Sequence, residues 1–519
     1  MIATIRSILG SLRTYGLLMA MVCAGVFQAT ALDANKRISQ FSHTSWIAKD
    51  GVPAPVFAIT QTPDGFLWLG TQAGLYKFDG QHFVRWEPLP GKAALSRGAV
   101  KALFVSRDGS LWIGYSSNAI SRLKDGELKT FTPQEGLHRG GVLSIAEDHH
   151  GGIWAGGELG FSRLVDGKWS RVEAAMGYPA PGARQILVDH QGTLWAATDG
   201  MNFGLGKDSI RVNTILKLRA NQTRFEPTGQ AVGYAAQLAE APNGQVWLSE
   251  ASGPTPAVRP VEGRSEPDIE RAVSKLPLCI LFDGEAGLWI GTFYGGLRRT
   301  ANFRATERAP FDDYEVRDGL SGEHIYALFK DHEGDVWLGT TRGVDRFREN
   351  KVTPYSTAEG LEPGARLALA ATKDGDVWIV SYPGALVQRV VGTKVVGVKL
   401  PAYSASDSTR ILSVHARDNH IWLGGSFGLA EGKDGWFNLV PIPGVSVGNT
   451  VEAVTSDSTG DLWLAVWQGY KTRIKRGRNG VWTHFPSQSS LPETHCRVLF
   501  GDAEGTSLAR LRDGRSSCI

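Results

Sequence analysis

A serine in a glycine-rich motif is the first candidate for chemistry. Residues 424–428 read GGSFG and match the G-x-S-x-G pattern, in which a serine acts as a nucleophile. That chemistry needs the serine on a strained turn between a strand and a helix. Here the motif aligns with GTQAG and GTTRG elsewhere in the chain, where the same pattern separates two short β-rich segments. We therefore interpret GGSFG as a turn between strands.

Two adjacent histidines are the second candidate. His149 and His150 lie in the stretch DHHGG, which has the composition of a turn. Neighbouring residues of a strand point to opposite faces, so the pair does not predict a metal site. The chain also lacks H-E-x-x-H, Walker and EF-hand patterns. The sequence predicts no metal, no cofactor and no catalytic constellation, and hence not an enzyme.

Basic and aromatic residues near predicted strand starts and turns are the third candidate. A guanidinium group forms forked hydrogen bonds to carboxylates and other oxygen-rich ligands. In two of the repeated segments described below, Arg366 and Arg410 stand at the predicted start of the first strand. The alternative is an ordinary solvated rim, because exposed arginine is common. The candidate ligand-binding residues are Arg97, Arg139, Arg184, Tyr294 and Arg342.

A repeat positions these residues. The phrase x-G-x-[LIV]-W marks ten copies, two of them with another residue in place of the glycine, at a spacing of about 42 residues that is typical of propeller blades. Each copy contains short β-rich runs interrupted by glycine and aspartate, which predicts four antiparallel strands per copy. Residues 267–276 have helical spacing and fall in one of the longer gaps. The repeated tryptophans are Trp68, Trp112, Trp154, Trp195, Trp247, Trp289, Trp337, Trp378, Trp422 and Trp463.

The first copy illustrates the expected geometry of a blade. Asp64 and Gly65 predict the turn between its first two strands, and Trp68 in the second strand is expected to fill the space between neighbouring sheets. Strands of a blade alternate in direction, so the turn between strands two and three opens on the same side as the connection between blades. Residues 136–141 and 319–324 are such connections. We expect ligands on that side, because binding residues concentrate on loops held by a rigid scaffold.

The number of copies predicts the domain organisation. Seven tryptophans, from Trp68 to Trp337, fill one ring, and residues 38–46 supply a strand that closes it. The predicted fold class is all-β: a seven-bladed β-propeller over residues 38–348, followed by an incomplete second propeller. Three to four blades of that second propeller occupy residues 349–505.

The amino terminus and the overall charge restrict location and partners. Arg6 and Arg13 precede a short apolar run, and small residues end at Ala31, so residues 1–31 are predicted to be a cleaved signal peptide. The mature protein is then periplasmic or secreted. Removing the two arginines from the formal net charge of +3 leaves +1, which argues against nucleic acid as a partner. The three remaining cysteines are widely spaced and predict no disulfide framework.

The stretches DGVP at 50–53 and AITQTPDGFLWLGTQAGLYKFDGQHF at 58–83, with the later DGL and EGL connectors, resemble the two-component regulator propeller family. The resemblance covers nearly all of the mature chain. It implies two seven-bladed propellers that sense a small molecule or an oligosaccharide in the periplasm. It also implies a following immunoglobulin-like domain, a membrane helix and a kinase or cyclase, in a dimeric, membrane-anchored protein. The alternatives are a secreted propeller lyase acting on a polysaccharide or lactone, and a protein-binding scaffold.

The last residues interrupt the repeat. Residues 497–505 open an eleventh copy, but no tryptophan follows near position 508. Read one base later, the codons of residues 506–511 can encode Leu-Trp-Leu-Gly-Tyr, so we hypothesise a frameshift, which truncates the second propeller. The competing interpretation is a natural terminus with a degraded repeat. The hypothesis predicts a disordered tail over residues 506–519.

Overall fold

The computed structural model describes residues 32–519 except for a set of short segments, and the chain divides into two compact units, Met1–Val352 and Thr353–Ile519. The predicted signal peptide and most of the predicted helical segment at 267–276 lie outside the described residues. In the part that is described, no helix has the length and hydrophobicity needed to span a membrane. The segments left out are 1–31, 89–93, 200–212, 234–235, 252–256, 264–274, 285, 305–310, 365, 383–385, 401–408, 434, 447–448, 485–494, 502–506, 512–515 and 519.

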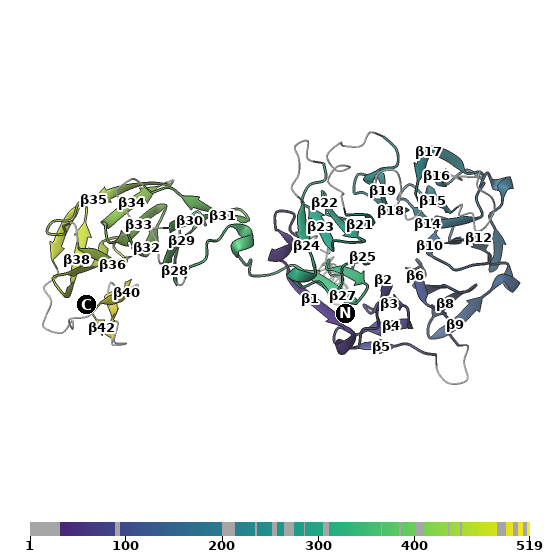
Figure 1. Ribbon diagram of the computed structural model, residues 1–519, viewed down its shortest axis with the longest axis horizontal. Coiled ribbons are helices and arrows are strands. Elements are labelled where there is room, and N and C mark those ends of the chain that lie inside the picture. The colour runs from purple at the N-terminus through teal and green to yellow at the C-terminus, as the bar shows by residue number, and fades with distance from the viewer. Residues whose placement is uncertain are drawn as a thin grey trace, which may run out of the picture. The chain divides into compact units, whose positions relative to one another are not determined.

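Antiparallel sheets of up to four strands build the first unit (Figure 1). Six of the sheets use strands in chain order. They are β2 (Val56–Gln61), β3 (Leu67–Thr71), β4 (Gly74–Phe78) and β5 (Phe83–Arg85); β6 (Val100–Val105), β7 (Leu111–Tyr115), β8 (Ile120–Lys124) and β9 (Glu127–Phe131); β10 (Ser144–Glu147), β11 (Ile153–Gly157), β12 (Gly160–Val165) and β13 (Lys168–Arg171); β14 (Gly182–Val188), β15 (Leu194–Asp199), β16 (Asn213–Leu218) and β17 (Glu226–Val232); β18 (Ala236–Glu240), β19 (Val246–Glu250) and β20 (Ala257–Pro260); and β21 (Pro277–Asp283), β22 (Gly287–Thr292), β23 (Leu297–Thr300) and β24 (Asp312–Tyr314).

The seventh sheet joins the two ends of the unit. It contains β25 (Ile325–Lys330), β26 (Val336–Thr340) and β27 (Gly343–Arg348), with the amino-terminal strand β1 (Ser42–Ile47) paired antiparallel to β27. The register places Ser42 opposite Arg348 and Ile47 opposite Gly343. The closing strand predicted at residues 38–46 is therefore present, and it ties the first described residues to the last sheet of the unit.

The sheets of this unit form a closed ring. The innermost strands β2, β6, β10, β14, β18, β21 and β25 each contact the next, and β25 contacts β2. Figure 1 shows these strands around a common centre, with the other strands of each sheet outside them. Among the described residues the only helical elements are short 3₁₀ turns, so the predicted all-β propeller of antiparallel blades is confirmed. These turns are η1 (Ile38–Gln40), η2 (Ala48–Asp50), η3 (Pro133–Glu135), η4 (Ala174–Met176), η5 (Val316–Asp318) and η6 (Thr357–Glu359).

The repeated tryptophans fill the spaces between neighbouring sheets, as predicted. All seven in this unit are buried. Trp68 on β3 packs with Leu111 and Ile113 of the following sheet, and Trp337 on β26 packs with Leu67 and Leu69 of the first sheet. Each ring brings a large apolar surface out of water. The same contact thus holds every pair of sheets together, including the pair that closes the ring.

Polar groups fix each indole in place. In several sheets the Nε1–H donates to the side chain six residues earlier, at 2.7–3.2 Å. On the third strand of most sheets, the residue that lies opposite the tryptophan is a lysine or an arginine. Its charged group lies 4.8–6.0 Å from the centroid of the indole ring. The accepting side chains are Thr62, Ser106, Asp148, Asp189, Asp331 and Asp457. The cations are Lys77, Arg122, Arg163, Lys217, Arg299, Arg346, Arg389 and Arg476.

The second unit repeats the same sheet. Its innermost strands β28, β32, β36 and β40 contact one another in that order. The strands are β28 (Arg366–Ala371), β29 (Val377–Tyr382), β30 (Leu386–Val391) and β31 (Lys394–Val398); β32 (Ile411–Arg417), β33 (His420–Gly425), β34 (Gly428–Lys433) and β35 (Trp436–Val440); β36 (Thr450–Ser456), β37 (Leu462–Gln468), β38 (Lys471–Arg478) and β39 (Val481–His484); and β40 (Cys496–Gly501), β41 (Ser507–Leu511) and β42 (Ser516–Cys518).

The tail differs from its prediction. We expected residues 506–519 to be disordered, but β41 pairs with β40, and β42 pairs with β41. Leu508 lies opposite Phe500, which is the register position that Trp463 takes opposite Thr455 in the preceding sheet. Backbone hydrogen bonds of a ladder do not depend on the side chain, so the last sheet forms with a leucine in the tryptophan position.

Candidate ligand-binding site

A β-bulge recurs in the innermost strands of the first ring. In β2, the register passes from Val56 to Ala58 and leaves Phe57 unpaired. Bulges of this kind redirect a side chain and are common beside functional sites. Because the innermost strands surround the centre of the ring, the bulged residues are the ones placed to reach into it. The residues skipped in this way are Phe57, Lys101, Arg184, Leu278 and Tyr326.

Aromatic rings form one half of the site. Phe57 and Tyr326, from neighbouring sheets, lie 5.3 Å apart. His324 stacks on Phe293 at 4.4 Å with an interplanar angle of 20°. Tyr294 meets both of these rings edge-on and is 61% exposed. His324 and Tyr326 meet edge-on at 6.5 Å, so these five rings form a continuous aromatic strip that ends in a solvent-exposed tyrosine.

Charged groups form the other half. Arg184 reaches Asp199 Oδ2 at 3.2 Å and Glu158 Oε1 at 3.5 Å, and the Asp199 side chain is fully buried. The Nζ of Lys101 lies 3.2 Å from the centroid of Phe57 and joins the two halves. Burial lowers the pKa of Lys101, Glu158 opposes this shift, and Arg184 adds to it. A partly desolvated ammonium group beside an aromatic ring binds anions and polar oxygens more strongly than a fully hydrated one.

The predicted division of the loops is confirmed by backbone hydrogen bonds. The turn after β3 is bonded to the connection before β2, through Gln72 N to Pro55 O at 3.2 Å. Ser116 N donates to Ala99 O, and Thr341 N donates to His324 O, in two other sheets. Turns between second and third strands therefore lie beside the connections between blades, on the side that carries the bulges.

The structure brings together only two of the predicted site residues. Arg184 is the bulged residue of β14, and Tyr294 ends the aromatic strip. Arg97, Arg139 and Arg342 are exposed on connections and turns of the same side, and the described contacts do not join them to this group. Their place on that side follows the predicted blade geometry, whereas their membership of one site remains a prediction.

Both later arginines precede the strand position at which we placed them. Val56 lies opposite Thr71, and its register equivalents in the second unit are Leu367, opposite Ser381, and Ile411, opposite Gly425. Arg366 and Arg410 each come one residue earlier. The shift arises in β28 because its register has no bulge, and in β32 because its turn to β33 is one residue shorter, so an alignment made on spacing alone is displaced by one residue.

Sequence reasoning missed a buried histidine in the connection that carries Arg139. The backbone N–H of His138 donates to Ser162 Oγ at 2.9 Å, and its ring Nδ1 lies 3.2 Å from the same oxygen. Burial lowers the pKa of His138 to about 4, so its imidazole is neutral at pH 7. In another connection Ser321 N donates to Asp345 Oδ1 at 3.0 Å in the same way. In both connections the residue that follows the Gly-Leu pair therefore anchors the connection to a neighbouring strand. Aligning the connections with one another would have identified His138 as a residue at this anchoring position.

The rejected motifs behave as turns. Ser426 of GGSFG lies between β33 and β34, and its Oγ accepts a hydrogen bond from Arg410 N at 3.0 Å. In DHHGG, Asp148 accepts hydrogen bonds from the backbone of His150 and Gly152 and from Trp154 Nε1. Among the residues that the structure describes, no group of three or more His, Cys, Asp and Glu side chains is placed to hold a metal ion.

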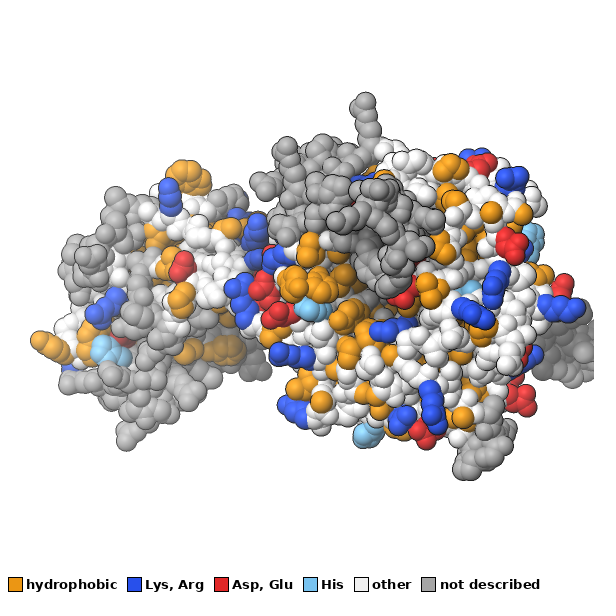
Figure 2. Space-filling model, turned by 45° about the vertical axis from the view of Figure 1, so that its right-hand side comes forward, with side chains coloured by type: hydrophobic (Ala, Val, Ile, Leu, Met, Phe, Trp, Pro, Cys, Tyr) orange, Lys and Arg blue, Asp and Glu red, His pale blue; other side chains and the backbone are white. Residues whose placement is uncertain are grey.

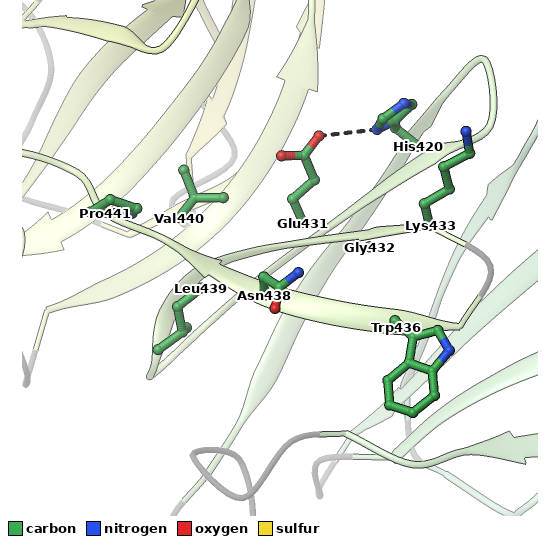
Figure 3. Close-up of a pocket in the computed structure, with 9 residues that line it drawn as sticks. All are labelled: His420, Glu431, Gly432, Lys433, Trp436, Asn438, Leu439, Val440 and Pro441. Carbon is green, nitrogen blue, oxygen red and sulfur yellow. Dashed lines mark hydrogen bonds and ion pairs between the residues drawn. The ribbon is translucent and has the colours of Figure 1, made fainter.

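A cavity of about 510 Å³ lies on the outer strands of the second unit (Figure 3). Among its lining residues, His420 Nδ1 and Glu431 Oε1 lie 3.1 Å apart in a hydrogen bond, and Trp436 points away from this pair. Glu431 lies opposite Trp422, at the position where most sheets carry a cation. The ring of His420 stacks on Trp422 at a centroid distance of 5.9 Å. In this sheet an imidazole ring, held by the glutamate, therefore lies beside the tryptophan.

The surface of the first unit carries both signs of charge. Figure 2 shows basic and acidic side chains interspersed over its visible face, with hydrophobic side chains between them.

The fold and the loop-side cluster define a β-propeller with its polar and aromatic groups gathered at one mouth of the ring. Residues 319–342 match the family model described as two component regulator propeller. The chain therefore carries the repeat of this family, and the resemblance predicted from the sequence is confirmed.

Comparison with solved structures gives remote similarities. Two crystal structures of the extracellular domain of BT4673 from B. thetaiotaomicron, described as a one component system and as a hybrid two component system, are 16% and 15% identical. Each alignment covers 92% of this chain, and 66% and 71% of the respective domain, with TM-scores of 0.46 and 0.47. A streptogramin B lyase is 17% identical over 60% of this chain and 98% of its own, with a TM-score of 0.43. No curated protein matches the sequence.

Proposed function

We propose that the first propeller is a ligand-sensing module of a two-component signalling protein and that it binds its ligand at the bulge-lined mouth of the ring. The observation that supports this is the convergence of bulged residues from different sheets. Phe57, Lys101 and Tyr326 come from three consecutive sheets around the ring, yet they are in contact through Phe57. Packing between blades does not require these contacts, because the tryptophans already fill the spaces between sheets.

The chemistry of the cluster suggests the class of ligand. An exposed aromatic ring stacks on the apolar face of a sugar or another flat molecule. Lys101 and Arg184 offer cationic donors, while Glu158 accepts hydrogen bonds from hydroxyl groups. A small ligand with an apolar face and several oxygens, such as a neutral or acidic sugar, would use both halves of the site.

Binding can be tested with a matched pair of tyrosines. Tyr294 and Tyr470 are both well exposed, at 61% and 85%, and both lie in turns between second and third strands, but in different units. A library of neutral and acidic mono- and oligosaccharides would be screened by thermal shift, and hits measured by calorimetry. We expect Tyr294→Ala to weaken binding by about fivefold or more, since a stacked ring contributes about 1–3 kcal/mol, and Tyr470→Ala to leave it unchanged.

Charge provides the second arm of this experiment. Lys101→Gln removes the ammonium group without creating a large cavity and should weaken an acidic ligand more than a neutral one. The proposal fails if no compound in the library binds. It also fails if Tyr294→Ala and Tyr470→Ala reduce the affinity equally, because the effect is then not specific to this mouth of the ring.

We further propose that the protein acts outside the cytoplasmic membrane, on the basis of the charged and apolar pattern of residues 1–31. A fusion of residues 1–60 to alkaline phosphatase, an enzyme active only after export, would be active in the periplasm. A fusion in which Arg6 and Arg13 are both changed to Glu is the control and should be exported poorly. An inactive wild-type fusion would contradict the proposal.

A further inference from the structure

The closing strand β1 carries a histidine that is hydrogen-bonded on both ring nitrogens. His43 Nε2 lies 2.9 Å from Asp345 Oδ1 on β27, and His43 Nδ1 lies 3.2 Å from the hydroxyl of Tyr314 on β24. An ionised carboxylate only accepts hydrogen bonds, so Nε2 carries a hydrogen and donates it to Asp345. The imidazole also stacks on the ring of Phe347 at 4.6 Å. His43 is therefore fixed by both nitrogens and by one face of its ring.

The same carboxylate holds a connection on the ligand side of the ring. Ser321 N donates to both oxygens of Asp345, at 3.0 and 3.2 Å, and Ser321 Oγ donates to Oδ2. Ser321 belongs to the connection at residues 319–324, which ends in His324. The ring of His324 stacks on Phe293 in the aromatic strip. The hydrogen bonds of Asp345 thus anchor the segment that presents one of the rings of the candidate site.

Other sheets anchor the equivalent connection with a neutral side chain. Ser162 on β12 and Gln388 on β30 lie opposite the residue that follows the repeated tryptophan, as Asp345 does. Ser162 accepts a hydrogen bond from His138 N, and Gln388 accepts one from Glu362 N. A carboxylate differs from these acceptors because it is charged and has roughly four lone-pair sites to satisfy. The sheet that contains β1 therefore needs an additional donor at this position.

The strand β1 supplies that donor. The Asp345 side chain is fully buried, and the described residues that donate to it are Ser321 and His43. A buried carboxylate that loses a donor is destabilised unless water or a movement of the backbone compensates. Without the Nε2–H of His43, all the remaining donors would come from the connection itself. The connection would then have to shift or admit water to satisfy the charge.

We propose that His43 is a positioning residue for the aromatic half of the candidate ligand site, acting through Asp345 and Ser321 on the connection that carries His324. The inference rests on the proposed function, because it takes the aromatic strip as part of the ligand site. The strand β1 then has two roles: it closes the ring of sheets, and it fixes the imidazole of His324 against Phe293.

Two amide substitutions separate the two nitrogens of His43. A glutamine amide nitrogen extends about as far from the backbone as the imidazole Nε2, whereas an asparagine amide extends only as far as Nδ1. His43→Gln therefore keeps a donor for Asp345, and His43→Asn does not. Both variants lose the ring that stacks on Phe347, so the difference between them reports the hydrogen bond to Asp345.

Nuclear magnetic resonance of the ligand-free protein with carbon-13-labelled histidine gives the first readout. The ring currents of Phe293 and Tyr294 act on the ring protons of His324, because these rings lie 4.4 and 5.2 Å away. The His324 signal is identified by its absence in His324→Gln. We expect this signal to move in His43→Asn and to stay close to its wild-type position in His43→Gln.

Amide hydrogen exchange gives the second readout. Residues 320–324 should exchange about tenfold faster in His43→Asn than in His43→Gln, because one hydrogen bond to a charged group is lost. Exchange in β11 should be the same in both variants. Equal His324 signals and equal exchange in the two variants would overturn the proposal, and so would an increase that is uniform over the ring. No ligand is used, so a failed saccharide screen leaves both readouts interpretable and the two proposals can fail separately.

Discussion

Replacing Trp154 by phenylalanine should cost more stability than the same change at Trp289. Both indoles are essentially fully buried, and both carry an arginine over the ring, at 4.8 and 5.1 Å. They differ in one respect. Trp154 Nε1 donates to Asp148 Oδ2 at 2.7 Å, whereas Trp289 Nε1 has no acceptor among the described residues. Both substitutions remove a similar ring volume, so the difference between them reports the hydrogen bond.

The magnitude follows from the charge of the acceptor. A hydrogen bond to a charged group contributes about 1.5–3 kcal/mol, and Trp154→Phe leaves a buried carboxylate short of one donor. Arg163 and two backbone N–H groups still serve Asp148, so we expect the lower part of this range, about 2 kcal/mol. With a denaturant slope of about 3 kcal/mol/M in urea, the two variants should differ in midpoint by about 0.7 M.

Urea unfolding followed by far-ultraviolet circular dichroism gives these midpoints. The two compact units can unfold separately, so the transition of the first unit is identified as the one that both substitutions shift. Equal midpoints for Trp154→Phe and Trp289→Phe would refute the reasoning. In that case the indole hydrogen bond contributes nothing, and packing alone explains the conservation of tryptophan along the repeat within this chain.

Two further predictions concern pH and closure of the ring. The pKa of His138 is about 4 in the folded protein and about 6.5 when unfolded, so stability is complete above pH 6.5 and falls as the pH drops toward 4, by about 3 kcal/mol in total. Urea midpoints between pH 7.5 and 4 should fall less for His138→Asn than for the wild type, and parallel curves would contradict this. Trp46 stacks on Trp337 at 5.5 Å and meets Phe78 edge-on. Trp46→Ala should therefore increase amide hydrogen exchange in β1 and β27 far more than in β11, and a uniform increase would contradict a closing role.

The sequence was sufficient to predict the blades. Trp68 and its nine equivalents recur with turn residues such as Gly65, whose φ of +86° favours glycine, so the spacing alone identifies the sheet and its buried face. The closing strand was also predictable, because residues 38–46 have β character and precede the first full copy. These features are local or periodic, and periodic features can be read without knowing which strands pair.

The site was only partly predictable, because a bulge depends on pairing register. Phe57, Lys101 and Tyr326 look like ordinary strand residues in the sequence, and only the shift between neighbouring strands directs them into the ring. Arg184 was identified because it lies beside the predicted start of a first strand. Tyr294 was identified because it lies at the tip of a turn. The buried imidazole of His138 was missed because its burial depends on Ser162, a residue of another strand.

The bulged position has a consequence for how such propellers diversify. Phe57 follows Val56, which is buried, and precedes Ala58, which lies against the glycine of the next strand. The skipped residue is free of both constraints, so it can change from phenylalanine to lysine, arginine, leucine or tyrosine among the sheets of one ring. Each of these five blades thus contributes one side chain to the mouth of the ring that selection can exchange without disturbing the scaffold. Recognition of a new molecule can therefore evolve, or be engineered, one blade at a time.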